Sequence, residues 1–115
     1  MPKQEIIDAI AQVKEAMAKT EAALDALDPK LYVIMWDGSV LKTDGSRVGV
    51  FGPNFYTNPS RAFMLAEQAK WNATIAKSDL KDREPAIVTT VYEALHEVRR
   101  INADLIATME KNNGL

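Results

Sequence analysis

Apolar residues near the N-terminus recur in steps of four and three, the spacing of one face of a helix. They are Ile6, Ile10, Val13, Met17, Leu24 and Leu27, and polar Thr20 interrupts the stripe. This pattern predicts a long amphipathic helix over residues 3–27. Asp28 and Pro29 end it, because Pro lacks a backbone N–H and disfavours helical geometry in the residue before it.

The hydrophobic period changes after residue 30. Residues 31–36 form an unbroken apolar run, and Asp37 and Gly38 separate it from a second, shorter one. Asp-Gly between two such runs is typical of a β-hairpin turn. A third strand over residues 46–51 would complete an antiparallel meander over residues 31–51. Because the first strand is apolar on both faces, we expect helix on one face and more helix or another subunit on the other.

A middle helix is predicted over residues 59–76, after a loop at 52–57. Asn58 would cap this helix, and Pro59 would occupy its first position. One face, made of Ala62, Leu65, Ala66, Ala69 and Ala73 and so mostly of small residues, would pack on the sheet, with Met64, Trp71 and Ile75 to one side.

A charged connector over residues 77–84 leads to a second long helix, predicted over residues 85–111. Its apolar stripe comprises Val88, Val91, Leu95, Val98, Leu105 and Met109. Asn102 stands in this stripe where Leu would be expected.

The predicted elements make a single α+β domain over residues 1–115, with a small antiparallel sheet flanked by a middle helix and two long terminal helices. Terminal helices of about 25 and 27 residues would span roughly 37 Å and 40 Å, more than a compact globule of this length holds. They therefore pair either as an antiparallel hairpin that protrudes from the sheet or with helices of another chain. We favour a homo-oligomer. Thr20 and Asn102 fit either arrangement, because a polar residue in an apolar seam fixes the register.

Composition narrows the possible functions. The 115 residues include 14 Lys plus Arg and 16 Asp plus Glu, for a formal net charge of -2, which disfavours broad nucleic-acid binding. No Cys is present, so disulfides, thiolate metal sites and cysteine nucleophiles are excluded. No apolar stretch reaches the length of a signal peptide or a membrane span, and we expect a cytoplasmic protein without a membrane partner.

Metal chemistry has one candidate pair. Glu93 and His96 have the Glu-x-x-His spacing of helical carboxylate metal sites, but such a site needs a second pair and further carboxylates. The glycines match no standard nucleotide-binding loop. We therefore expect no metal, no cofactor and no catalytic residue.

Residues 52–61 form the candidate ligand site. A helix N-terminus beside Arg and aromatic side chains can bind a phosphate, a nucleotide or an acidic side chain. The ligand-binding candidates are Arg47, Asn54, Tyr56, Ser60 and Arg61. The alternative is an ordinary loop in which Phe55 and Tyr56 anchor the chain to the core.

Three large aromatic residues are the candidates for binding a protein partner: Trp36, Trp71 and Tyr92. Core packing is the first explanation for each of them. If they are exposed, they would serve as interface anchors, because Trp and Tyr dominate binding energy.

The hairpin of residues 31–42, followed by a Phe-containing strand and an Ala-rich helix, resembles the strand-strand-helix units of short orphan proteins of bacteriophages. The resemblance implies an accessory protein that inhibits or sequesters host molecules, and it implies the host cytoplasm as its location. It assigns no functional residue.

Two functions are therefore expected. The first is a non-enzymatic interaction protein that oligomerises through its long helices and binds or inhibits a protein partner, as a phage anti-defence or host-takeover factor would. The alternative is a protein that sequesters a phosphate-bearing small ligand, such as a nucleotide signal, through residues 52–61.

Overall fold

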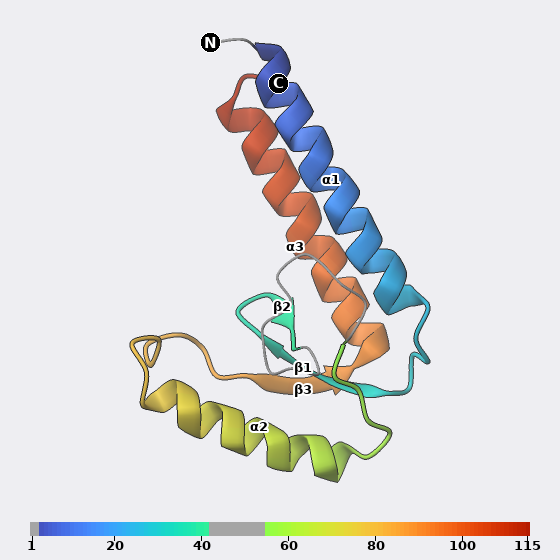
Figure 1. Ribbon diagram of the computed structural model, residues 1–115, viewed down its shortest axis with the longest axis vertical. Coiled ribbons are helices and arrows are strands. Elements are labelled where there is room, and N and C mark those ends of the chain that lie inside the picture. The colour runs from blue at the N-terminus through green and yellow to red at the C-terminus, as the bar shows by residue number, and fades with distance from the viewer. Residues whose placement is uncertain (1–2, 42–54) are drawn as a thin grey trace.

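The computed structural model of the protein describes residues 3–41 and 55–115. These residues form an α+β fold of three helices and one three-stranded antiparallel sheet (Figure 1). In chain order the elements are α1 (Lys3–Asp25), β1 (Tyr32–Trp36), β2 (Ser39–Val40), α2 (Arg61–Ala76), β3 (Ile87–Thr90) and α3 (Val91–Asn112). The α+β class predicted from the sequence is confirmed.

Helices α1 and α3 lie side by side and run in opposite directions as a hairpin that protrudes from the sheet (Figure 1). On α1, Ile10, Met17 and Leu24 are buried at intervals of seven residues. Asn102 joins the two helices, because its amide donates to the Glu21 carboxylate at 3.1 Å. The Cα radius of gyration, 15.8 Å, exceeds the value of about 13 Å for a compact chain of this length. Within the chain the two long helices therefore form the hairpin, and pairing with helices of another chain stays a prediction.

The predicted turn between β1 and β2 is also confirmed. Asp37 and Gly38 both have positive φ, 53° and 78°, as a two-residue type I′ turn requires. Trp36 and Ser39 are the paired residues that flank the turn. The Asp-Gly sequence forms this turn because Gly adopts positive φ freely and Asp tolerates it better than most residues.

The third strand of the described sheet comes from a segment that the sequence pattern assigned to a helix. Strand β3 (Ile87–Thr90) pairs with β1, so the order across the sheet is β2-β1-β3, and the predicted strand over residues 46–51 lies outside the described residues. Helix α3 accordingly begins at Val91 and not at Pro85. The four residues of β3 are all β-branched and fit a strand well. Thr90 then caps α3, because its hydroxyl accepts from the Glu93 N–H at 3.2 Å.

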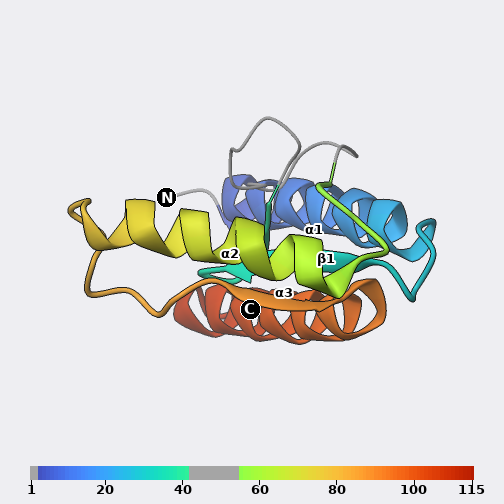
Figure 2. The same ribbon diagram turned by 90° about the horizontal axis from the view of Figure 1, so that it is seen from below.

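Strand β1 contributes to two hydrophobic cores. Val33 and Met35 pack into a core with buried residues of α1 and α3, whereas Ile34 and Trp36 pack into a second core with α2. The helical hairpin and α2 therefore lie on different sides of the sheet (Figure 1), and from below α2 is seen in front of β1 (Figure 2). Both faces of β1 are covered, as its sequence predicted, and helices of the same chain cover them.

The predicted inner face of α2 is wrong. Met64 and Ile75 are the buried residues of this helix, and Trp71 packs against the same core. The predicted face is largely exposed, and its alanines are Ala62, Ala66, Ala69 and Ala73. Counting only apolar residues missed the inner face, because Gln68 and Asn72 belong to it and bond to the backbone of Ala86.

The start of α2 is shifted as well. Ser60 is the N-cap, and its hydroxyl accepts from the Phe63 N–H at 3.1 Å. The Asn58 side chain, predicted to be the cap, instead accepts from the Ser60 N–H at 2.7 Å. Asn58 thus forms the turn that leads into the cap, and Pro59 precedes the helix.

Candidate functional site

The predicted ligand site around residues 52–61 is only partly described. Arg47 and Asn54 lie outside the described residues. Arg61 is exposed at the first position of α2, and the Ser60 hydroxyl is engaged as the N-cap. Binding of a phosphate-bearing ligand here stays a prediction.

Tyr56 and Phe55 support the alternative of a structural loop. Phe55 is buried in the core beneath α1 and α3, and the Tyr56 ring contacts the Phe63 ring edge to face at 6.5 Å. Burial raises the pKa of the Tyr56 hydroxyl, and the Glu67 carboxylate adds to this rise while Lys70 opposes it. The two aromatic residues therefore hold this segment against both cores.

Two of the three aromatic partner candidates belong to the core. Trp36 is 5% exposed, and its indole N–H donates to the Glu84 carbonyl at 2.9 Å. The Trp71 ring meets Trp36 edge to face at 5.9 Å, and its buried indole N–H has no acceptor among the described residues. Tyr92, by contrast, is 59% exposed and stacks edge to face on His96 at 4.6 Å. Of the three, Tyr92 is the exposed one, and its contact with a protein partner stays a prediction.

Glu93 and His96 make separate contacts. The Glu93 carboxylate accepts from the Thr89 hydroxyl at 2.7 Å, whereas His96 lies against Tyr92. Across residues 3–41 and 55–115, no group of three or more His, Cys, Asp or Glu residues is placed to hold a metal ion. In the same part of the chain, no helix is both long and apolar enough to cross a membrane.

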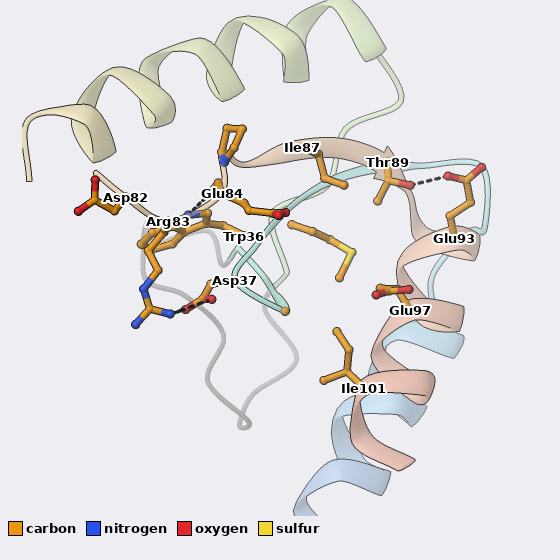
Figure 3. Close-up of a pocket in the computed structure, with 13 residues that line it drawn as sticks. Trp36, Asp37, Asp82, Arg83, Glu84, Ile87, Thr89, Glu93, Glu97 and Ile101 are labelled. Atoms are coloured by element: carbon orange, nitrogen blue, oxygen red, sulfur yellow. Dashed lines mark hydrogen bonds and ion pairs between the residues drawn. The ribbon is translucent and has the colours of Figure 1, made fainter. Parts of the chain in front are cut away.

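A groove that the sequence did not predict opens between β3 and α3, and we call it the β3–α3 groove (Figure 3). Its volume is about 650 Å³. Strand β1, the hairpin turn, the end of the connector, β3 and α3 all contribute to it. The lining residues are Met35, Trp36, Asp37, Gly38, Asp82, Arg83, Glu84, Pro85, Ile87, Thr89, Glu93, Glu97 and Ile101.

The wall formed by α3 follows from helix geometry. Residues four apart lie on one face of a helix, and Glu93, Glu97 and Ile101 keep this spacing along the groove (Figure 3). Helix α3 begins directly after Thr90, so it turns away from the sheet at the end of β3. Ile87, at the other end of this edge strand, is 53% exposed.

The opposite wall is the connector before β3, and three elements hold it in place. Arg83 donates to both carboxylate oxygens of Asp37 in the hairpin turn, each at 3.2 Å. The Glu84 carbonyl accepts from the Trp36 indole of β1. The backbone of Ala86 bonds to the side chains of α2. These bonds connect segments separated by 14 to 48 residues, so the groove exists only in the folded chain.

The groove combines negative charge with apolar surface. Five of its thirteen lining residues are acidic and one is basic, whereas acids and bases are nearly balanced in the whole chain. The acidic residues are Asp37, Asp82, Glu84, Glu93 and Glu97. Arg100 lowers the pKa of the Glu97 carboxyl, mainly through a side-chain hydrogen bond. Ile87, Ile101 and Pro85 supply the apolar part.

The chain matches no family model, no curated protein and no solved structure. Its candidate function therefore depends on the geometry and charge of the β3–α3 groove.

Two sequence signals for the groove were available. Glu93 and Glu97 are four residues apart on a predicted helix, and Ile87 begins a run of four β-branched residues typical of a strand. The predicted helix over residues 85–111 absorbed that run and hid the strand. The approach of Asp37 to residues 82–84 leaves no local signal, because it depends on the pairing of β1 with β3.

Proposed function

We propose that the protein is a non-enzymatic interaction protein that binds another protein through the β3–α3 groove. The observation that supports this proposal is an open groove in which an exposed Ile87 lies among five acidic residues. Protein interfaces of this kind combine an apolar centre with a polar rim. Burial of Ile87 by a partner would contribute binding energy, while the carboxylates would speed encounter and select the partner by charge.

The rigidity of the walls favours such a role. The connector is bonded to Asp37, to Trp36 and to the amides of α2, and α3 is capped at Thr90. A binding surface that is already ordered loses less conformational entropy when a partner docks. The groove would therefore bind with little rearrangement of its own backbone.

Self-association through the long helices stays a separate prediction. The buried stripe of α1 faces α3 of the same chain, so a second copy is not needed to cover it. Light scattering on the purified chain tests this prediction, because the mass of one copy is 12.8 kDa.

Affinity capture from extracts of the source organism tests the proposal. The proteins retained by the wild type are compared with those retained by two variants. Ile87→Lys places a bulky cation in the groove at an exposed strand position, where Lys is well tolerated. Ile7→Lys is the matched control, because Ile7 is 39% exposed on α1 and does not line the groove. We expect a specific partner to bind the wild type and Ile7→Lys and to be lost from Ile87→Lys.

A partner that binds Ile87→Lys as well as the wild type would contradict this proposal. Thermal denaturation with a panel of nucleotides tests the alternative of phosphate sequestration. A rise in melting temperature that Arg61→Ala abolishes would favour that alternative, and no rise with any phosphate ligand would count against it.

A further inference from the structure

The spacing of the acidic residues on α3 limits the kind of segment that the β3–α3 groove can hold. Glu93 and Glu97 are four residues apart, which corresponds to about 6 Å along a helix. Residues i and i+2 of an extended chain are about 6.6 Å apart and point to the same side. Two side chains at alternate positions of an extended segment can therefore each meet one of these carboxylates.

Both carboxylates can accept a further hydrogen bond. The Thr89 hydroxyl binds Glu93, and Arg100 binds Glu97. An ionised carboxylate offers about four lone-pair positions, so these bonds leave room for another donor on each group. A Lys or Arg side chain is the donor that fits, because a charged bond is stronger than a neutral one.

The floor of the groove is apolar, so it favours an apolar side chain between the two basic side chains of a bound segment. Ile87 pairs with Met35 across the sheet, and both residues line the groove together with Ile101. In an extended segment, the residue between i and i+2 points to the opposite side, away from α3. An apolar residue at that position would cover Ile87.

The charge of the remaining lining residues disfavours anionic ligands. Glu84 reaches toward the groove from the connector side, Asp82 lies at the outer end of the connector, and Arg83 is bonded to Asp37 (Figure 3). A phosphate group or an acidic segment would meet like charges from both walls, which disfavours its binding. Charge complementarity thus points to a cationic occupant.

We infer, on the basis of the proposed function, that the β3–α3 groove binds an extended segment of a partner protein. Basic and apolar residues alternate along this segment. The basic residues bond to Glu93 and Glu97, and the apolar residue between them packs on Ile87.

Fluorescence anisotropy of labelled short peptides tests this inference on the full chain. The first peptide alternates Lys and Leu, the second alternates Glu and Leu, and the third alternates Lys and Ser. We expect the wild type to prefer the Lys-Leu peptide, and its binding to weaken as salt is added. Unlabelled spermine serves as a competitor that carries positive charge without apolar side chains.

Three variants locate the binding. Glu93→Gln with Glu97→Gln should weaken the Lys-Leu peptide by about tenfold or more, the effect of losing two charged acceptors. Asp8→Asn with Glu15→Gln makes the same change of charge on exposed positions of α1 and should leave binding within about twofold. Ile87→Lys should abolish binding without unfolding the chain, which circular dichroism checks independently.

Each remaining outcome is decisive. Preference for the Glu-Leu peptide, or no binding of any peptide, overturns the basic-segment inference. If the Lys-Ser peptide binds as tightly as the Lys-Leu peptide, the groove attracts charge alone. The same holds if spermine displaces the Lys-Leu peptide at an equal concentration of positive charge. Either result also overturns the basic-segment inference. If the Glu-Leu peptide binds and Ile87→Lys abolishes that binding, the proposed function stands while this inference fails. Binding of the Lys-Leu peptide that survives in Ile87→Lys overturns both.

Discussion

Ala86 is fully buried just before β3, and side chains of α2 satisfy its backbone. Its N–H donates to the Asn72 side-chain oxygen at 2.8 Å, and its carbonyl accepts from Gln68 at 2.8 Å and from Asn72 at 3.2 Å. A strand edge must have its polar groups paired or hydrated, and here two amides take the place of a neighbouring strand. The same contacts position the connector that forms one wall of the β3–α3 groove.

Asn72→Ala should therefore destabilise the chain by about 1–3 kcal/mol, because it leaves the buried N–H of Ala86 without an acceptor. Gln68→Ala is the matched control. It removes one of two donors to the same carbonyl and should cost only about 0.5–1.5 kcal/mol. Urea denaturation followed by circular dichroism measures both, and a larger loss in Gln68→Ala would contradict this account.

At the scale of elements, the terminal helices could be predicted from the sequence, whereas strand β3 could not. The helices were predicted from a stripe repeated over more than twenty residues, which no other structure would accommodate equally well. Residues 87–90 are only four β-branched residues, and a run of this length is ambiguous between strand and helix. Their pairing with β1 decided the matter, since β1 offered an edge that residues 87–90 cover.

Leu24 tests the packing of α1 on the rest of the chain. It is fully buried in the core with Val33 and Val98, so Leu24→Ala should reduce the free energy of unfolding by about 2–5 kcal/mol. Ile7→Ala on the same helix is the control, because Ile7 is 39% exposed and its loss should cost less than about 1 kcal/mol. Chemical denaturation gives both values. Equal effects would mean that α1 does not pack against α3 and the sheet as described.

At the scale of the whole molecule, β1 links two cores. Its residues alternate between the core beneath the helical hairpin and the core beneath α2. Each core is built on one face of β1, so a core that unfolds removes this strand from the other core. The two cores should therefore unfold in a single transition.

Unfolding by guanidinium should accordingly give one midpoint by two probes. Tryptophan fluorescence reports the core beneath α2, where Trp36 and Trp71 meet, and far-ultraviolet circular dichroism reports mainly the long helices. Separate midpoints would show that the hairpin and the α2 side unfold independently. A midpoint that rises with protein concentration would instead reveal self-association, which keeps the oligomer prediction open to a direct test.

The sequence by itself determined the features that depend on near neighbours. Repeated apolar spacing specified the two long helices, and Asp37 with Gly38 specified the hairpin turn, because helix and turn geometry are encoded within a few residues. The unbroken apolar run of β1 also required cover on both faces.

Only the tertiary structure decided which segment became the third strand, which face of α2 is buried, and where the groove lies. Each of these depends on contacts such as Trp36 with Glu84 and Asp37 with Arg83, which join residues 46 or 48 positions apart. Such contacts are selected by packing and by hydrogen-bond satisfaction in the whole fold, and no local pattern along the chain specifies them.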